Sequence, residues 1–312
     1  MNKSYQTRSA LSIPRRSFIS TACATFISLH IARSAKADSD GILDQSENPL
    51  EAISGPVGDF SRQGGYGQPA AGNAIEIKGT SPISITMAAP VNHVNGEIPV
   101  VIAVHGANQS PQSMWSLSAH LASHGFFVII PDIMQKSLQD TVDALHDVMR
   151  SLPFLSDQTG YRLKSTEAVF IAKDSSAAAC IALTGGNVQG VVGKSWVASC
   201  LITSDMSEEA QASLSTYSTP VVSILDATTS EDTISAMEQT PSEGLRTLVA
   251  IKGMTNAIFD EVDELNPVTY YWRSYLGCTV AAYSHRDSAL LDLVTGSAYK
   301  NITHSVIQVA VA

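Results

Sequence analysis

Residues 167–183 join an apolar run to a run of small residues, and side chains that could do chemistry stand between the two. The stretch reads EAVFIAKDSSAAACIAL, with Asp174, Ser175 and Ser176 at the junction. A sharp turn from a buried strand into a helix is a common way to present a nucleophile. The residue types therefore indicate attack on an ester or similar electrophile by Asp174 or Ser175. Attack by a serine also needs a histidine base and a carboxylate that orients it.

A second stretch, residues 101–132, carries the most specific pattern in the chain, VIAVHGANQSPQSMWSLSAHLASHGFFVIIPD. A strand ending in His-Gly, a helix, the hexapeptide LASHGF and a strand ending in an acid closely resemble the bacterial cutinase and polyester (PET) hydrolase family, which is related to dienelactone hydrolases. The resemblance covers most of the chain after the N-terminal segment and implies an α/β-hydrolase fold. It places the two backbone N–H groups of an oxyanion hole at Ala107 and Ser175.

The same resemblance predicts a degenerate catalytic triad. The family's Gly-x-Ser-x-Gly turn becomes AKDSS here, so Asp174 stands where the nucleophilic serine belongs. The family's acid falls on Thr229 and its histidine on Asn256. The resemblance also places Trp196 where the family keeps an aromatic residue along its substrate cleft.

Three alternative nucleophiles could still support hydrolysis. A turn shifted by one residue would make Ser175 the nucleophile, but Lys173 would then crowd the strand and the helix. Ser195, in GKSWV, has a preceding Gly but lacks the second small residue. Asp174 could itself attack, as carboxylates do in haloalkane dehalogenases and epoxide hydrolases of this fold. That mechanism still needs a base, and Asn256 has no titratable proton near neutral pH.

The remaining histidines could supply a base only from elsewhere in the fold. His105 directly precedes Gly106 at the expected oxyanion hole. In the family that this chain resembles, the residue at this position has no catalytic role. We expect structural or solvated roles for it and for the others outside the N-terminal segment, which are His93, His120, His124, His146, His285 and His304.

Strand and helix patterns alternate along the rest of the chain, which predicts a doubly wound, mostly parallel sheet with helices on both faces and no separate lid domain. We expect one domain over residues 48–312. Its expected elements are an opening hairpin within 74–90, strands at 98–106, 126–132, 167–172, 188–196, 218–226 and 245–253, the last of them, and helices at 111–124, 139–152, 176–183 and from about 267.

The first 37 residues are predicted to be an export signal. They contain Arg15-Arg16 followed by Phe18, a short apolar run, and Ala35-Lys36-Ala37 as a cleavage site, which is typical of the twin-arginine route. The apolar run is too short and too rich in Ser and Thr to span a membrane. We expect a flexible segment at 38–47 and a periplasmic or secreted protein.

Composition narrows the classes of partner. The chain has 312 residues, 44% of them hydrophobic and 15% charged, with a formal net charge of -10, so nucleic acid is not an expected partner. Cys180, Cys200 and Cys278 would remain after cleavage, allowing at most one bridge. Their spacing does not suggest a zinc site, and no metal or cofactor is implied.

Three functions follow as hypotheses. The first is an exported pseudoenzyme that binds a small molecule, polymer or partner without cleaving it. The second is a hydrolase in which Asp174 or Ser175 is an atypical nucleophile. The third is a structural or assembly role at the cell surface.

Overall fold

The structure is a computed structural model that describes residues 60, 62–67, 69, 74–80, 82–92, 94–184, 195–203, 221–225, 232, 246–251, 267–295 and 307–311. These residues all belong to one compact unit, Ile42–Ala312. The predicted export signal and cleavage site lie outside the described residues, as do Thr229, Asn256, His93 and His304.

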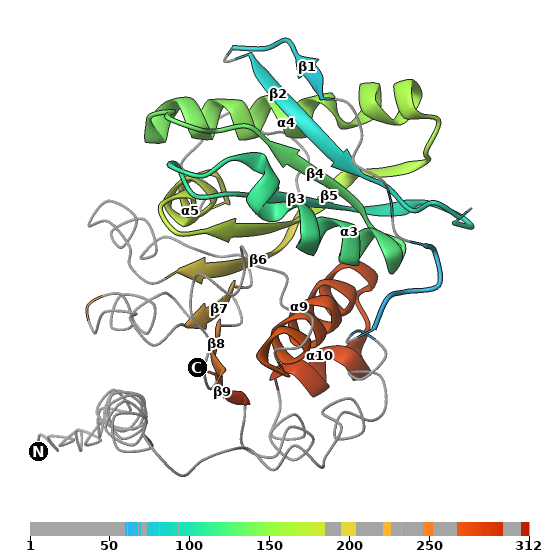
Figure 1. The fold of residues 1–312 in the computed structure, drawn as a ribbon, viewed down its shortest axis with the longest axis vertical. Helices are drawn as coiled ribbons and strands as arrows, with labels where there is room; N and C mark the ends of the chain where they lie inside the picture. The colour runs from blue at the N-terminus through green and yellow to red at the C-terminus, as the bar shows by residue number, and fades with distance from the viewer. Residues whose placement is uncertain are drawn as a thin grey trace, which may run out of the picture. The chain divides into compact units, whose positions relative to one another are not determined.

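A nine-stranded sheet forms the centre of this unit, in the order β1-β2-β4-β3-β5-β6-β7-β8-β9 (Figure 1). Strands β3 to β8 run parallel to their neighbours among themselves, whereas β1, β2 and β9 pair antiparallel. The strands are β1 (Ile75–Ile77), β2 (Ile83–Ala88), β3 (Ile98–Val104), β4 (Phe127–Pro131), β5 (Leu163–Lys173), β6 (Ser195–Thr203), β7 (Val221–Leu225), β8 (Arg246–Ile251) and β9 (Ile307–Val311).

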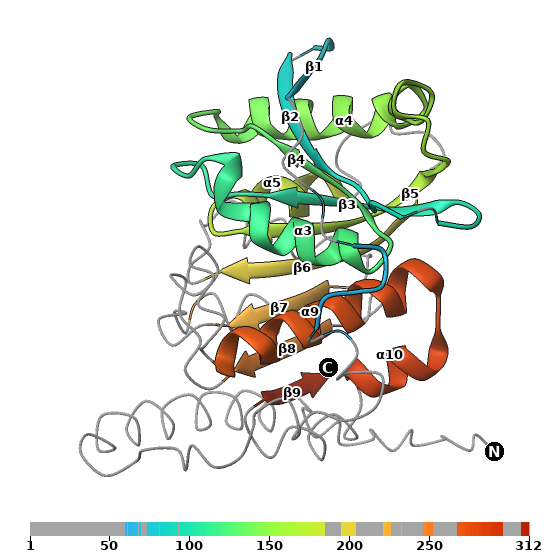
Figure 2. The same ribbon diagram turned by 45° about the vertical axis from the view of Figure 1, so that its right-hand side comes forward.

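Helices cover both faces of the sheet, as the alternating pattern predicts (Figure 2). The 3-10 turn η1 (Pro111–Met114) leads into α3 (Trp115–Ser123), which shares one face with α9 (Pro267–His285). The other face carries α4 (Leu138–Thr159) and α5 (Ser176–Thr184). Because both faces are covered, the apolar runs of β3 and β4 are buried along their whole length.

The main core fills the space between the sheet and the α3/α9 face. Trp272 and Tyr275 on α9 pack there with Leu121 of α3 and with inward-facing strand residues such as Val101 and Val128. Fully burying such side chains stabilises the fold by about 1.5–3 kcal/mol each. The core therefore holds β3, β4 and β5 rigidly and fixes the loops that leave them.

Turn residues set where the flanking helices begin and end. The Asp140 N–H donates to Ser137 Oγ at the start of α4, and Gly160 ends that helix with a φ of 73°. The C-terminal helices separate at Arg286, whose φ is 54°, and α10 (Ser288–Thr295) begins beyond Asp287. Asp287 Oδ1 accepts the N–H groups of Ala289 and Leu290.

Two predicted elements need correction. The strand predicted over residues 188–196 is β6, which begins only at Ser195 and runs to Thr203, because WVASCLIT is the run that pairs with β5 and β7. Residues 188–194 lie outside the described part of the chain. The strand near residue 250 is also not the last one, since β9 follows α10 and adds an antiparallel partner to β8.

A segment that we call the N-terminal strap, residues 60 and 62–66, lies along α3. His120 Nε2 bonds the Phe60 carbonyl at 2.8 Å, and the Gly64 N–H donates to Ser123 Oγ at 2.8 Å. The Tyr66 N–H donates to the Ser123 carbonyl at 2.9 Å. A Cβ built on Gly64 would lie only 2.1 Å from that carbonyl oxygen, so the close approach of strap and helix requires glycine.

Gly64→Ala should therefore lower the free energy of unfolding by about 3 kcal/mol, because a backbone carbonyl must move to make room. Urea denaturation followed by circular dichroism measures the change. Gly65→Ala is the matched control, because a Cβ on this neighbouring glycine of the strap would meet no atom within 4 Å. Equal losses in the two variants would contradict the account of the strap.

Candidate functional site

The register of two central strands brings the two predicted motifs together. β3 and β5 are parallel neighbours, and Val104 pairs with Ala172 at their carboxyl ends. Gly106 and Asp174 each stand two residues beyond that pair. The His-Gly loop and the Asp-Ser turn therefore meet at the carboxyl edge of the sheet, where open α/β sheets bind their ligands.

Asp174 forms the tip of the turn between β5 and α5. Its φ is 51°, a left-handed conformation that non-glycine residues rarely adopt. The Ala177 N–H donates to the Asp174 carbonyl at 3.0 Å, which closes the turn into the helix. The carboxylate is half-buried and lies against the other loop, since a Cβ built on Gly106 would lie 3.2 Å from Asp174 Oδ2.

Both backbone donors of the His-Gly loop are bonded to side chains of the protein. The Ala107 N–H donates to the hydroxyl of Ser175 at 3.3 Å. The Gly106 N–H donates to Gln109 Oε1 at 3.2 Å. At the oxyanion position predicted for Ala107, the N–H thus already has an oxygen partner. Sequence reasoning missed Gln109, because its contact depends on the turn that its own N–H closes by donating to the Gly106 carbonyl at 2.9 Å.

His105 holds the loop together and is not available as a base. Its Nδ1 is 2.8 Å from the Gly106 carbonyl, and its Nε2 is 3.2 Å from the Ile133 N–H. Because Ile133 donates, Nε2 is unprotonated and Nδ1 carries the proton. Burial lowers the pKa of the imidazole below its usual range, so the ring is neutral near pH 7. The Ser176 hydroxyl donates to the His105 carbonyl and joins α5 to the same loop.

The other described histidines serve the scaffold. His120 and His124 of α3 bond the backbone carbonyls of Phe60 and Arg62 in the strap. Burial lowers the pKa of His120 to about 3, so it stays neutral. His285 contacts Phe126 just before β4 begins, at the amino edge of the sheet, and His146 lies on α4. These positions agree with the structural roles expected from the sequence.

Trp196 does not lie beside the turn, which corrects its assignment to the cleft. Its backbone pairs with Ala168, six residues before Asp174 along β5. At a rise of about 3.3 Å per residue, Trp196 is roughly 20 Å from the carboxyl edge. Ser195 pairs with Glu167 and is equally remote, so it cannot act as a nucleophile at this site. The cleft assignment failed because it placed the strand seven residues too early.

Two exposed apolar side chains flank the site on the segment after β4. The Gln135 N–H donates to the Ala107 carbonyl at 2.9 Å, and Gln135 has a φ of 61°. Its neighbour Met134 is 48% exposed, and Leu138 is 38% exposed. Sequence analysis did not single out these residues, because the segment IMQKSL has no motif and only its contact with Ala107 gives it meaning.

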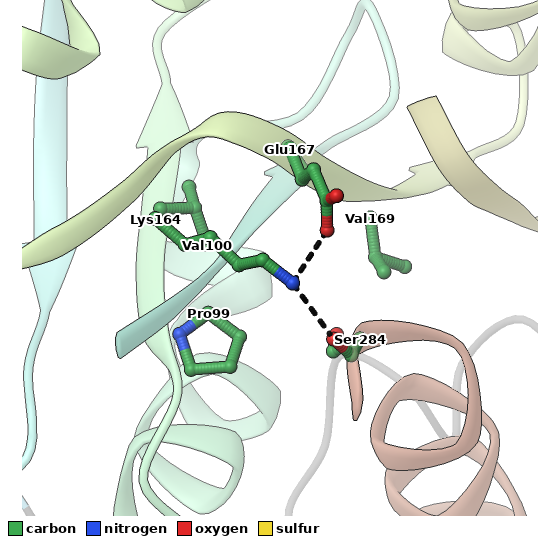
Figure 3. A pocket seen from close by; sticks show the side chains of 7 residues that line it. Pro99, Val100, Lys164, Glu167, Val169 and Ser284 are labelled. Carbon is green, nitrogen blue, oxygen red and sulfur yellow. Dashed lines mark hydrogen bonds and ion pairs between the residues drawn. The ribbon is translucent and has the colours of Figure 1, made fainter. Parts of the chain in front are cut away.

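A shallow hollow away from this site is lined by charged side chains that form ion pairs within the fold (Figure 3). It lies at the start of β3 and β5, at the sheet edge opposite Asp174. Lys164 Nζ is 2.6 Å from Glu167 Oε2 and 3.5 Å from the Ser284 carbonyl, and Arg286 bonds the other oxygen of Glu167 at 2.6 Å. These ion pairs attach α9 to β5, so we assign the hollow a structural role.

The sequence analysis also considered cysteines, a metal site and a membrane-spanning segment. Cys180 and Cys278 are buried and form no disulfide, and burial raises the pKa of both thiols. Among the described residues, no three His, Cys, Asp or Glu side chains gather as a metal site would require. In the part of the chain that the structure describes, no helix is long and apolar enough to cross a membrane.

The strained turn leads to a test by substitution. Asp174→Gly should be more stable than Asp174→Ala by about 1 kcal/mol, because a left-handed φ costs alanine roughly 1–2 kcal/mol and glycine only its larger unfolded-state entropy. Urea denaturation of the two variants gives the difference. The same pair of substitutions at Arg150, exposed inside α4, should favour alanine by about 1 kcal/mol. An alanine preference at both sites would contradict the observed turn.

Comparison with known families agrees with this geometry. A family model described as Chlorophyllase matches residues 67–181, from the end of the strap through most of α5, and so includes both loops of the site. No curated protein matches the chain. The matched family is α/β-hydrolase-like and related to dienelactone hydrolases and cutinases. Together with the mostly parallel sheet and its covering helices, the match shows that this hydrolase-like protein has an α/β-hydrolase fold.

Proposed function

We propose that this chain is an exported, catalytically impaired relative of polyester hydrolases, which binds a ligand or partner at the carboxyl edge of its sheet. One observation carries the proposal. Asp174 occupies the turn where a hydrolase presents its serine, while the neighbouring hydroxyl of Ser175 occupies the Ala107 N–H. A tetrahedral intermediate needs such an N–H to stabilise its oxyanion.

The environment of the turn supports the same proposal. His105 uses both ring nitrogens in the scaffold, so it does not activate a hydroxyl or a water. Thr229 and Asn256, assigned to the acid and the base by resemblance to the polyester hydrolases, have side chains that serve neither role near neutral pH. Export by the twin-arginine route, supported by Arg15-Arg16 and Ala35-Lys36-Ala37, would place this function in the periplasm or outside the cell.

A second candidate is a hydrolase with a carboxylate nucleophile, and the position of Asp174 at the tip of the turn favours it. Asp174 would attack an electrophilic carbon, displace a halide or open an epoxide, and form an ester that a base-activated water then cleaves. Mass spectrometry after incubation with an epoxide distinguishes the candidates. A mass increase on Asp174 would support the hydrolase, and an unmodified protein would support the binding protein.

Reconstruction of the triad tests the proposal by activity. The wild-type chain should not hydrolyse p-nitrophenyl butyrate above the buffer rate, whereas the triple variant Asp174→Ser, Thr229→Asp, Asn256→His should gain measurable turnover, because it restores nucleophile, acid and base. Release of p-nitrophenolate at 405 nm is the measurement.

The single variant Asp174→Ser is the control for the restored acid and base and should remain inert. Adding Ser175→Ala to the triple variant should increase turnover by about tenfold or more, since one oxyanion donor contributes roughly a hundredfold or more in kcat. Turnover by the wild-type chain would contradict the proposed loss of catalysis. If the triple variant is folded but inert, and the added Ser175→Ala does not restore turnover, then Thr229 or Asn256 has been assigned wrongly.

A further inference from the structure

The turn that leads into β3 holds two neighbouring groups that can react with each other. Asn95 and Gly96 are both exposed, and they precede Ile98, the first residue of β3, at the edge of the sheet opposite to Asp174. Gly96 has a φ of 90°, and a Cβ built on it would meet no atom within 4 Å. The Asn95 side-chain amide and the Gly96 backbone nitrogen therefore stand side by side on an open turn.

Hydrogen bonds hold the residues after this turn and leave the two groups themselves free. Glu97 Oε1 lies 3.7 Å from Arg162 Nε, and the Ile98 N–H donates to the Arg162 carbonyl at 2.7 Å. Within the described part of the chain, neither the Asn95 side chain nor the Gly96 N–H has a hydrogen-bond partner. The nitrogen of Gly96 can thus approach the Asn95 amide without breaking a contact of the fold.

The other two asparagines that the structure describes, Asn92 and Asn108, are equally exposed but restrained. Asn92 Nδ2 donates to a backbone carbonyl of the strap at 3.2 Å. Asn108 is followed by Gln109, whose N–H donates to the Gly106 carbonyl at 2.9 Å. A bonded N–H must open before its nitrogen can attack, which makes the attack slower. Among the described asparagines, Asn95 alone combines an unbonded amide with an unbonded N–H on the next residue.

We propose that Asn95 is a site of spontaneous deamidation, in which the Gly96 nitrogen attacks Asn95 Cγ. The new bond between Cγ and that nitrogen closes a five-membered succinimide ring, and the bond from Cγ to Nδ2 breaks. Nδ2 leaves as ammonia and takes the proton of the Gly96 N–H. Glycine favours the attack, because it has no Cβ to crowd the nitrogen and its backbone is the least restricted.

Water then opens the ring at either of its two carbonyls. Addition at Cγ gives aspartate and keeps the original main chain. Addition at the backbone carbonyl gives isoaspartate, in which the main chain passes through Cγ. Each product carries a new carboxylate close to the ion pair of Glu97 with Arg162, so the modified chain is more acidic by one charge. The inference is independent of ligand binding and of catalysis at Asp174.

Peptide mapping of the full purified chain, after incubation at mildly alkaline pH, tests the inference. Cleavage after glutamate yields residues 77–97, with Asn92 and Asn95, and places Asn108 in the next peptide. Fragmentation by electron transfer locates the change and distinguishes aspartate from isoaspartate, with Asn95→Asp as the standard. Asn95 should convert at least about tenfold faster than Asn92 or Asn108, and its product should include isoaspartate.

A parallel incubation in guanidinium chloride separates the effect of the fold from that of the local sequence. Folding should change the rate at Asn95 by less than about threefold and slow that at Asn108 by about tenfold or more, since only the second site has a bonded N–H after it. Gly96→Ala should slow conversion of Asn95 by about tenfold or more in both states, because a Cβ crowds the attacking nitrogen. Circular dichroism checks that this variant is folded, and the denatured comparison holds even if it is not.

The inference is overturned if Asn95 stays intact in the folded chain, if Asn92 or Asn108 converts as fast, or if folding slows Asn95 as much as Asn108. It is also overturned if Gly96→Ala leaves the rate unchanged, or if the product contains no isoaspartate. None of these outcomes depends on ester turnover, so this modification and the proposed function can fail separately.

Discussion

The parallel pairing of β3 with β5 is the constraint on which the site depends. Val104 and Ala172 are opposite each other, so both strands end at the same level and their loops face each other. A shift of either strand by one residue would turn its side chains to the other face and separate Asp174 from Gly106. The buried core between the sheet and α3 and α9 prevents such a shift, because it fixes which face of each strand is covered.

We propose that the side chains at this turn have replaced the reactive groups of a hydrolase. A serine at the tip of the turn would be neutral and would act with N–H donors that stabilise a developing negative charge. Here the tip carries a carboxylate, and the hydroxyl of Ser175 and the amide oxygen of Gln109 accept the nearby N–H groups. The turn keeps a left-handed residue at its tip, and we propose that the side chains around it do not support ester hydrolysis.

Much of the fold could be predicted from sequence, and the reason is visible in particular elements. β3 and β4 are long apolar runs because both of their faces are buried, and such runs are readable without a structure. The turn at Asp174 was equally readable, since an apolar run meets a small-residue helix there. β6 was misplaced because the apolar residues around 191 and 196 offer two starts, and only pairing with β5 selects Ser195. β9 was missed because it follows two helices at the end of the chain.

Resemblance to the polyester hydrolases predicted roles for Ala107, Asp174 and Ser175, and these roles remain predictions. The contacts of Ser175 and Gln109 could not be predicted, because they depend on how two loops approach in space. The resemblance also misplaced Trp196, whose distance from the turn follows from strand register.

Labelling of the purified chain with a fluorophosphonate, followed by intact-mass measurement and peptide mapping, tests the central claim most directly. The account predicts an unmodified protein, because no activated serine stands at the turn. A phosphonylated Ser175 or Ser176 would contradict it and would show that the turn still presents a nucleophile.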